Sequence, residues 1–231
     1  MVQLDAADNP YLLLTPGPLS TTRTVKMAMM RDWCTWDQDY NGIIRRLRED
    51  LVALATDKTG EYTAVLMQGS GTFAVESVIG SAIPPDGRLL VLTNGAYGER
   101  IVRMAEVLGI PNRKQDSTEV VRVDFDRLQK TLADNPDLTH VAVVHCETTT
   151  GMLNDIERVG RIVKEYGKGF IVDAMSSFGG IPIGVAGLQI ALLISRANKC
   201  IQGVPGFGVV IARCSRLVGL RVNVRSLALD V

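Results

Sequence analysis

Residues 169–180 read GFIVDAMSSFGG. An apolar run ends in Asp173, and a turn rich in serine and glycine follows. Such a continuous run is typical of a strand covered by helices on both faces of a parallel sheet. A carboxylate at the end of a buried strand is costly unless a cation pairs with it or it caps the following turn. Both interpretations remain open from this stretch alone.

Further apolar runs of the same kind occur along the chain, separated by amphipathic stretches. The expected strands are Thr63–Gln68, Arg88–Thr93, His140–His145, Gly169–Asp173, Ala191–Ser195 and Gly208–Ala212. The expected helices are Asn41–Ala55, Phe73–Ala82, Gly98–Leu108, Phe125–Asp134 and Glu157–Tyr166. Strands that alternate with helices predict an α/β fold, a mostly parallel sheet sandwiched by helices.

Composition excludes several classes of protein. The chain has 231 residues, of which 46% are hydrophobic, and its 25 basic and 25 acidic residues balance to zero net charge. Balanced charge argues against a nucleic-acid partner, and the hydrophobic share is that of a globular domain. We find no eighteen-residue apolar stretch and no basic leader, so we expect neither a membrane association nor a signal peptide.

The cysteines favour a reducing compartment. Cys34, Cys146, Cys200 and Cys214 are far apart and form no CxxC pair, and the chain has only two histidines. We therefore expect four reduced cysteines in a cytoplasmic protein, without a zinc site or any other metal site.

A glycine-rich turn follows the first expected strand. Residues 68–72 read QGSGT and precede a helix. Ser70, Gly71 and Thr72 could bind a phosphate with backbone and hydroxyl donors at the helix N-terminus, or Ser70 could simply cap that helix. The stretch contains neither GK[ST] nor a complete GxGxxG, so a nucleotide-binding module is not favoured.

Two more strand ends carry reactive or polar side chains. Lys199 lies in ANKCIQGVPG, residues 197–206, after the run ALLIS. A partly desolvated lysine has a lowered pKa and reacts with carbonyl groups, although a lysine in a loop is commonly exposed. Residues 145–151, HCETTTG, offer hydroxyls for orienting a polar ligand or form a polar turn.

Together these signals match the needs of pyridoxal 5'-phosphate. A phosphate turn, a strand-end aspartate and a downstream lysine would hold the phosphate, the pyridine nitrogen and the aldehyde of this cofactor, in that order. Tyr97 follows the strand expected at residues 88–93 and is placed to stack on the ring.

The motifs also resemble a known family. TPGP, QGSGTFAVE, NGAYGER, HCETTTG, VDAMSSFGGIP and ANKCIQGVPG occur in this order. They are similar to the class V, fold-type I aminotransferases, in particular to the branch that acts on 2-aminoethylphosphonate and pyruvate. The resemblance runs from about residue 11 to residue 212.

The resemblance implies a role for each matching residue. Lys199 is similar to the lysine that binds the cofactor and moves protons, and Asp173 to the partner of the ring nitrogen. Thr148 matches a hydroxyl near the phenolic oxygen, Asn198 a second polar contact and Met175 an apolar side chain against the ring. The implied cofactor-binding residues are Ser70, Gly71, Thr72, Tyr97, Thr148, Asp173, Met175, Asn198 and Lys199, and Lys199 is also catalytic.

The implied reaction transfers the amino group of 2-aminoethylphosphonate to pyruvate, giving phosphonoacetaldehyde and L-alanine, in a homodimer. The resemblance assigns residues 1–45 to a segment bordering the active site and the dimer interface, and residues 46–215 to the cofactor-binding large domain. Residues 216–231 are expected to lead towards a C-terminal domain. That domain carries the substrate-binding arginine in relatives, so we expect this arginine to lie outside the chain.

Other activities stay open at this point. A serine– or alanine–glyoxylate aminotransferase of the same class is the nearest alternative, and a catalytically inactive cofactor domain is another. A cysteine desulfurase is disfavoured, because that branch has histidines where this chain has Tyr97 and Asn198. Arg196 stands where close relatives more often have a small residue.

Overall fold

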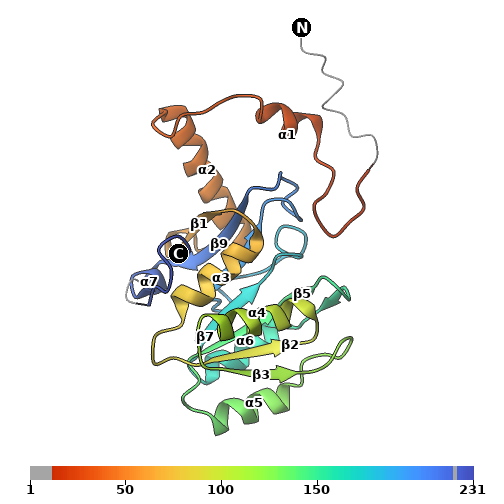
Figure 1. Cartoon of the computed structure of the whole chain (residues 1–231), viewed down its shortest axis with the longest axis vertical. Helices are drawn as coiled ribbons and strands as arrows, with labels where there is room; N and C mark the ends of the chain where they lie inside the picture. Colours follow the sequence, from red (N-terminus) through yellow and green to blue (C-terminus); the bar gives the residue numbers. More distant parts are fainter. Residues whose placement is uncertain (1–11, 221–222) are drawn as a thin grey trace.

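A seven-stranded sheet forms the centre of the computed structural model, which describes residues 12–220 and 223–231. Residues 1–11 of the expected N-terminal segment and residues 221–222 of the expected exit segment lie outside the described residues. The strands follow the order β1 (Tyr62–Gln68), β9 (Phe207–Arg213), β8 (Leu192–Arg196), β7 (Gly169–Asp173), β4 (His140–Val144), β2 (Leu89–Thr93) and β3 (Asn112–Asp116). Figure 1 labels β1, β9, β7, β2 and β3.

Strand β9 alone runs against the other six. It pairs antiparallel with both β1 and β8, whereas β8, β7, β4, β2 and β3 pair parallel. The expected mostly parallel sheet is therefore confirmed. The carboxyl ends of six strands and the beginning of β9 consequently lie at the same edge of the sheet.

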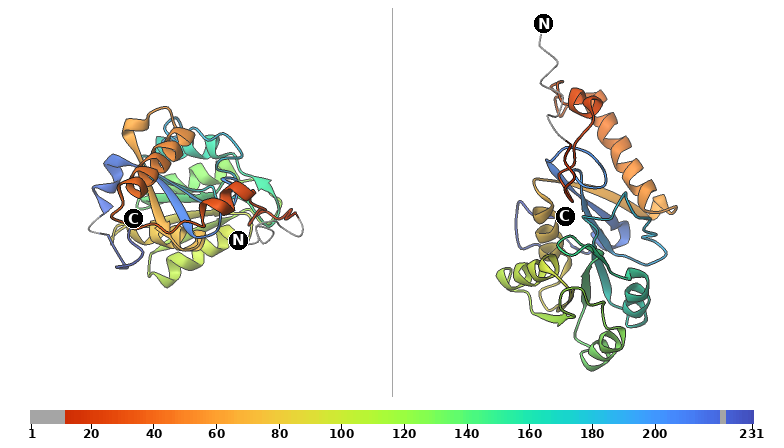
Figure 2. Two further views of the ribbon diagram at one scale, coloured as in Figure 1. Left: turned by 90° about the horizontal axis from the view of Figure 1, so that it is seen from above. Right: turned by 90° about the vertical axis from the view of Figure 1, so that its right-hand side faces the viewer.

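The strands alternate between two apolar cores, one on each face. In β4, Val141 and Val143 belong to one core, and Ala142 and Val144 belong to the other. The first core contains residues of α2 (Gln38–Ala55), α5 (Phe125–Asp134) and α6 (Ile156–Glu165), and the second contains residues of α3 (Gly71–Ala82) and α4 (Ala96–Val107). The right-hand view of Figure 2 shows helices on both sides of the strands.

The remaining elements are short. They are α1 (Arg23–Ala28), the 3-10 helix η2 (Thr59–Glu61), α7 (Cys214–Leu217) and a two-stranded hairpin of β5 (Cys146–Glu147) and β6 (Met152–Leu153). None of the helices within residues 12–220 and 223–231 is long and apolar enough to cross a bilayer.

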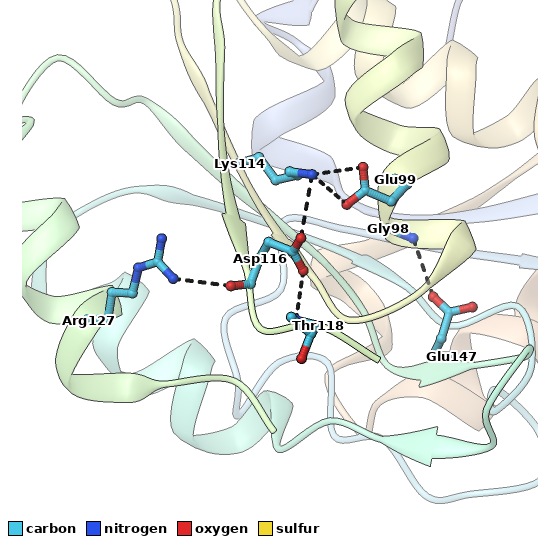
Figure 3. Close-up of polar contacts among 7 residues, drawn as sticks. All are labelled: Gly98, Glu99, Lys114, Asp116, Thr118, Arg127 and Glu147. Atoms are coloured by element: carbon cyan, nitrogen blue, oxygen red, sulfur yellow. Dashed lines mark hydrogen bonds and ion pairs between the residues drawn. The ribbon is translucent and has the colours of Figure 1, made fainter. Parts of the chain in front are cut away.

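The predicted strands and helices are all present, with ends displaced by at most three residues. Strand β3 is not among the predicted elements, because its sequence NRKQD contains no apolar residue. It is an edge strand stabilised by polar contacts: Lys114 Nζ lies 3.0 Å from Glu99 Oε1 and 3.6 Å from Asp116 Oδ2 (Figure 3). The hairpin β5–β6 and helix α1 are further elements that the sequence patterns do not predict.

The described part of the C-terminal segment packs against α3. Arg225 donates hydrogen bonds of 2.9 Å and 2.7 Å to the carbonyl oxygens of Gly80 and Ile83, near the end of this helix. The backbone N–H of Val231 donates to Ser81 Oγ at 3.4 Å. The segment thus provides donors to the end of α3, where the last carbonyl groups of a helix lack partners within it.

Helix α3 approaches the sheet closely at a glycine. A Cβ atom on Gly208 of β9 would lie 2.6 Å from Cβ of Ala74 in α3. Non-bonded carbon atoms do not come so close, so any larger residue at position 208 would push α3 away from the sheet.

Gly208→Ala should therefore lower the free energy of unfolding by roughly 1–3 kcal/mol through overpacking. Urea unfolding measures this change. Gly184→Ala is the matched control, because a Cβ at this exposed glycine meets nothing within 4 Å. Equal stability of the two variants would contradict the close contact between α3 and β9.

Candidate active site

A cavity of about 260 Å³ opens at the shared edge of the sheet. Its walls include most of the predicted site residues, which come from five separate segments of the chain: Gly71, Thr72, Tyr97, Thr148, Asp173, Met175 and Lys199. Ser70 and Asn198 lie beside these residues in sequence but do not line the cavity. Pro16 and Gly17 of the N-terminal segment close one wall.

The turn before α3 exposes backbone donors. Gly69 has φ +111°, and a Cβ atom there would lie 2.3 Å from the ring of Phe73. Ser70 caps the helix, since its Oγ accepts from the N–H of Phe73 at 3.4 Å. The N–H groups of Gly71 and Thr72 find no acceptor among the described residues. The turn therefore has both predicted features, a serine cap and free donors at a helix N-terminus.

The loop between β8 and β9 folds tightly around Lys199. The carbonyl oxygen of Lys199 accepts from the N–H of Gln202, and that of Ala197 accepts from the N–H of Gly203, both at 2.8 Å. A third bond of 2.8 Å joins the N–H of Gly69 to the carbonyl oxygen of Gly206. These bonds fix the lysine loop beside the turn that begins α3.

Two hydroxyls hold the amine of Lys199. Its Nζ donates to Ser176 Oγ at 2.8 Å and to Thr148 Oγ1 at 3.3 Å, and these two oxygens are 2.6 Å apart. Lys199 is only 5% exposed. Ser176 is absent from the predicted site residues, although it lies in the serine-rich turn directly after Asp173.

Asp173 ends β7, the middle strand of the sheet. It is 3% exposed, and its Oδ1 accepts from the N–H of Met175 at 2.9 Å. Burial raises the pKa of this carboxyl from 3.8 to about 6, against the opposing effects of the Met175 N–H and the charge of Lys199. Among the described residues, no cation lies within ion-pair distance of it.

Burial also lowers the pKa of Lys199, and the charge of Arg196 lowers it further, while Asp173 opposes both effects. A larger share of this amine is therefore neutral near physiological pH than for an exposed lysine. A neutral, fixed amine can attack a carbonyl carbon or accept a proton.

Tyr97 is held in place by a buried glutamate. Glu147 is fully buried, and its Oε2 accepts from the backbone N–H of Tyr97 at 3.2 Å. It also accepts from the backbone N–H of Gly98 at 3.4 Å (Figure 3). A Cβ atom on Gly95 would lie 2.3 Å from Cγ of Glu147, so this glycine gives the glutamate room. The ring centroid of Tyr97 lies 5.4 Å from Nζ of Lys199.

Three residues near the cavity are absent from the predicted site. Glu147 acts on the backbone of a distant helix, and no local spacing indicates this contact. Arg100 lies one turn after Tyr97, and its guanidinium carbon is 4.9 Å from the Tyr97 ring centroid. Ser176 could have been found from its position after Asp173.

Comparison with known proteins identifies the family. Residues 27–222 match the family described as Aminotransferase class-V. This chain belongs to the class-V aminotransferases.

Curated relatives of this class-V aminotransferase carry a more specific name. A 2-aminoethylphosphonate–pyruvate transaminase of Syntrophobacter fumaroxidans is 62% identical over 97% of the chain and 60% of the relative. A protein of the same name from Bacillus cereus is 57% identical, with 97% and 61% covered. The chain thus spans about 60% of the length of these relatives.

A solved structure agrees with the fold. The alanine–glyoxylate aminotransferase of a Nostoc species superposes with a TM-score of 0.87 at 26% identity, covering 99% of this chain and 61% of that one. The predicted fold-type I architecture is therefore confirmed.

Family membership implies pyridoxal phosphate as the cofactor, and the cavity residues fit this group. The buried carboxylate of Asp173 has no cationic partner within the described part of the chain, which a protonated pyridine nitrogen would supply. Free N–H groups at the start of α3 suit a phosphate. A Cβ atom on Gly71 would lie 2.5 Å from Sδ of Met175, so glycine leaves space for this arrangement.

The raised pKa of Asp173 gives a measurable pH dependence. The folded chain binds a proton at Asp173 more tightly than the unfolded chain does. This contribution to stability is complete below about pH 4 and is lost as the pH rises through about 6. Asp173→Asn should remove this loss of stability with rising pH, because an amide does not ionise. The amide oxygen still accepts the hydrogen bond from the Met175 N–H.

In cofactor-free protein, we expect Asp173→Asn to be more stable than the parent by about 1–3 kcal/mol at pH 7.5, with the difference shrinking towards pH 4. Urea unfolding across this range measures the difference. Burial lowers the pKa of His140 and His145 to about 4, which gives both proteins the opposite trend. A difference that stays constant with pH would contradict the raised pKa.

Proposed function

We propose that this chain forms the cofactor-binding part of a pyridoxal-phosphate-dependent transaminase that moves the amino group of 2-aminoethylphosphonate to pyruvate. The observation that supports it most is the convergence of Lys199, Asp173, Tyr97 and Thr72 on one cavity. The two curated relatives carry the name of this activity at 57–62% identity.

Each wall of the cavity has one proposed task toward the cofactor. Ser70, Gly71 and Thr72 bind the phosphate through the donors at the start of α3. Asp173 pairs with the ring nitrogen and keeps it protonated. When bound, pyridoxal phosphate supplies an aldehyde that carries the amino group and a ring that accepts electrons.

The remaining predicted residues orient and enclose the ring. Tyr97 stacks on it from the start of α4, and Met175 packs against it from the turn after β7. Thr148 donates or accepts a hydrogen bond near the phenolic oxygen. Asn198 is 2% exposed, and its Oδ1 has no partner among the described residues, so it is available for a polar contact.

Lys199 is the proposed acid and base. Its neutral Nζ takes a proton from the substrate carbon that bears nitrogen and returns it at the next stage. Ser176 and Thr148 hold Nζ between these transfers, since their oxygens lie 2.8 Å and 3.3 Å from it. The lowered pKa of Lys199 favours this role at neutral pH.

The overall exchange balances without an external oxidant. The amine-bearing carbon of 2-aminoethylphosphonate is oxidised to the aldehyde of phosphonoacetaldehyde. The keto carbon of pyruvate is reduced and receives the amino group to give L-alanine.

The organisation of the protein is part of the same proposal. Residues 46–215 form the cofactor-binding domain, with residues 1–45 at its border and residues 216–231 leading to a further domain. A homodimer is supported by exposed apolar side chains of the N-terminal segment, such as Leu14, Met30 and Trp36, which are 86%, 74% and 90% exposed. A cytoplasmic location is supported by four free cysteines.

Borohydride reduction in the presence of pyridoxal phosphate should attach the cofactor to Lys199. Peptide mapping by mass spectrometry locates the label. Lys199→Ala should abolish it, whereas Lys164→Ala, which removes an exposed lysine of α6, should leave it unchanged. Label scattered over surface lysines would contradict the proposed cofactor site.

Substrate choice needs a separate assay. Alanine formation is followed with 2-aminoethylphosphonate and pyruvate, and glycine formation is followed in parallel with serine and glyoxylate. Faster turnover of the first pair supports the proposal. Faster turnover of the second pair favours the alternative, a serine– or alanine–glyoxylate enzyme. Labelling of Lys199 without turnover of either pair would indicate an inactive cofactor domain.

A further inference from the structure

We infer that Arg196 binds the phosphate group of the cofactor and acts as a cationic clamp opposite the N-terminus of α3. This inference rests on the proposed function, because it concerns the same cavity and the same cofactor. It adds a residue that lies outside the glycine-rich turn, at the end of a different strand.

Arg196 ends β8 at the edge where the cavity opens. It is half-buried and lines the cavity together with Gly71 and Thr72. Its backbone is fixed on one side by the pairing with Gly208 of β9. The side chain therefore starts from a rigid strand and not from a loose loop.

The stem of Arg196 lies against the first residue of α3. A Cβ atom built on Gly71 would be 3.0 Å from Cδ of Arg196. The guanidinium is attached to this Cδ through Nε, so it is within reach of the first turn of the helix. The N–H groups of Gly71 and Thr72 in that turn have no acceptor in the described part of the chain.

The side chains that line the cavity include more basic than acidic groups, which favours an anionic ligand. Arg100, Arg196 and Lys199 line it, against the single carboxylate of Asp173. None of the ion pairs found within residues 12–220 and 223–231 involves Arg100 or Arg196. Arg100 lies over the Tyr97 ring, whereas the guanidinium of Arg196 lies over no ring of the described residues.

A phosphate suits this place, because two kinds of donor are available to its several oxygens. The guanidinium presents a planar set of donors that match phosphate oxygens, and the α3 N-terminus adds backbone donors to the same anion. Binding there would also neutralise the repulsion between Arg196 and Lys199.

The test compares pyridoxal phosphate with pyridoxal, which lacks the phosphate. Dissociation constants are measured by absorbance titration for the parent, Arg196→Met and Arg196→Lys. Methionine keeps the aliphatic stem and removes the charge. We expect Arg196→Met to weaken pyridoxal phosphate binding roughly 10- to 100-fold and to leave pyridoxal binding unchanged, with Arg196→Lys recovering part of the loss.

Arg103→Met is the matched control, because Arg103 is exposed on α4, where it pairs with Glu106. It should change neither affinity, and circular dichroism verifies that all variants are folded. An equal loss for both compounds in Arg196→Met would overturn the inference and indicate a structural role. An unchanged ratio together with weaker binding of 2-aminoethylphosphonate would also overturn it, since Arg196 would then bind the substrate.

Failure of the proposed function has a different signature. If the parent binds neither pyridoxal nor pyridoxal phosphate at Lys199, the proposed function and this inference fall together. If the parent binds both compounds and the Arg196 variants have the same ratio of the two dissociation constants as the parent, this inference is wrong but the proposed function stands.

Discussion

A carboxylate is held in the interior at the end of the middle strand. Asp173 has a buried environment, one backbone N–H as donor, and no cation within ion-pair distance among the described residues. Placing a charge there is unfavourable, and the raised pKa expresses this cost. The surrounding elements bring Lys199, the donors of α3 and the Tyr97 ring to the same edge. The structure thus places an unfavourable buried carboxylate where a cationic ligand atom could pair with it.

The reversal of β9 brings the lysine to that edge. In a wholly parallel arrangement, a helix would follow β8 and carry the chain away from the strand ends. Here the chain turns back at once, and the loop of residues 197–206 stays beside the other strand ends. The bond between Gly69 and Gly206 joins this loop to the turn before α3. A backbone hydrogen bond between two distant segments therefore holds the lysine loop next to the free N–H groups at the start of α3.

Much of this arrangement is predictable from the sequence, because buried strands have continuous apolar sequences and the residues that line the cavity follow directly after them. Asp173, Lys199 and Tyr97 are predicted in this way, and all three line the cavity. Strand β3 escapes prediction because its polar sequence is stabilised at an edge by Lys114 and its partners. The reversal of β9 and the support of Tyr97 by Glu147 depend on contacts between distant segments, which no local pattern reveals.

The sequence separation of the strand pairs has a consequence for folding. β8 and β9 are neighbours in the chain, so their pairing closes a short loop and has a low entropic cost. β9 must also pair with β1, which lies far earlier in the chain, and such non-local contacts form slowly. The lysine turn can therefore form early and locally. Its contact with the turn before α3 requires the pairing of β1 with β9, so the cavity is complete only after this non-local pair has formed.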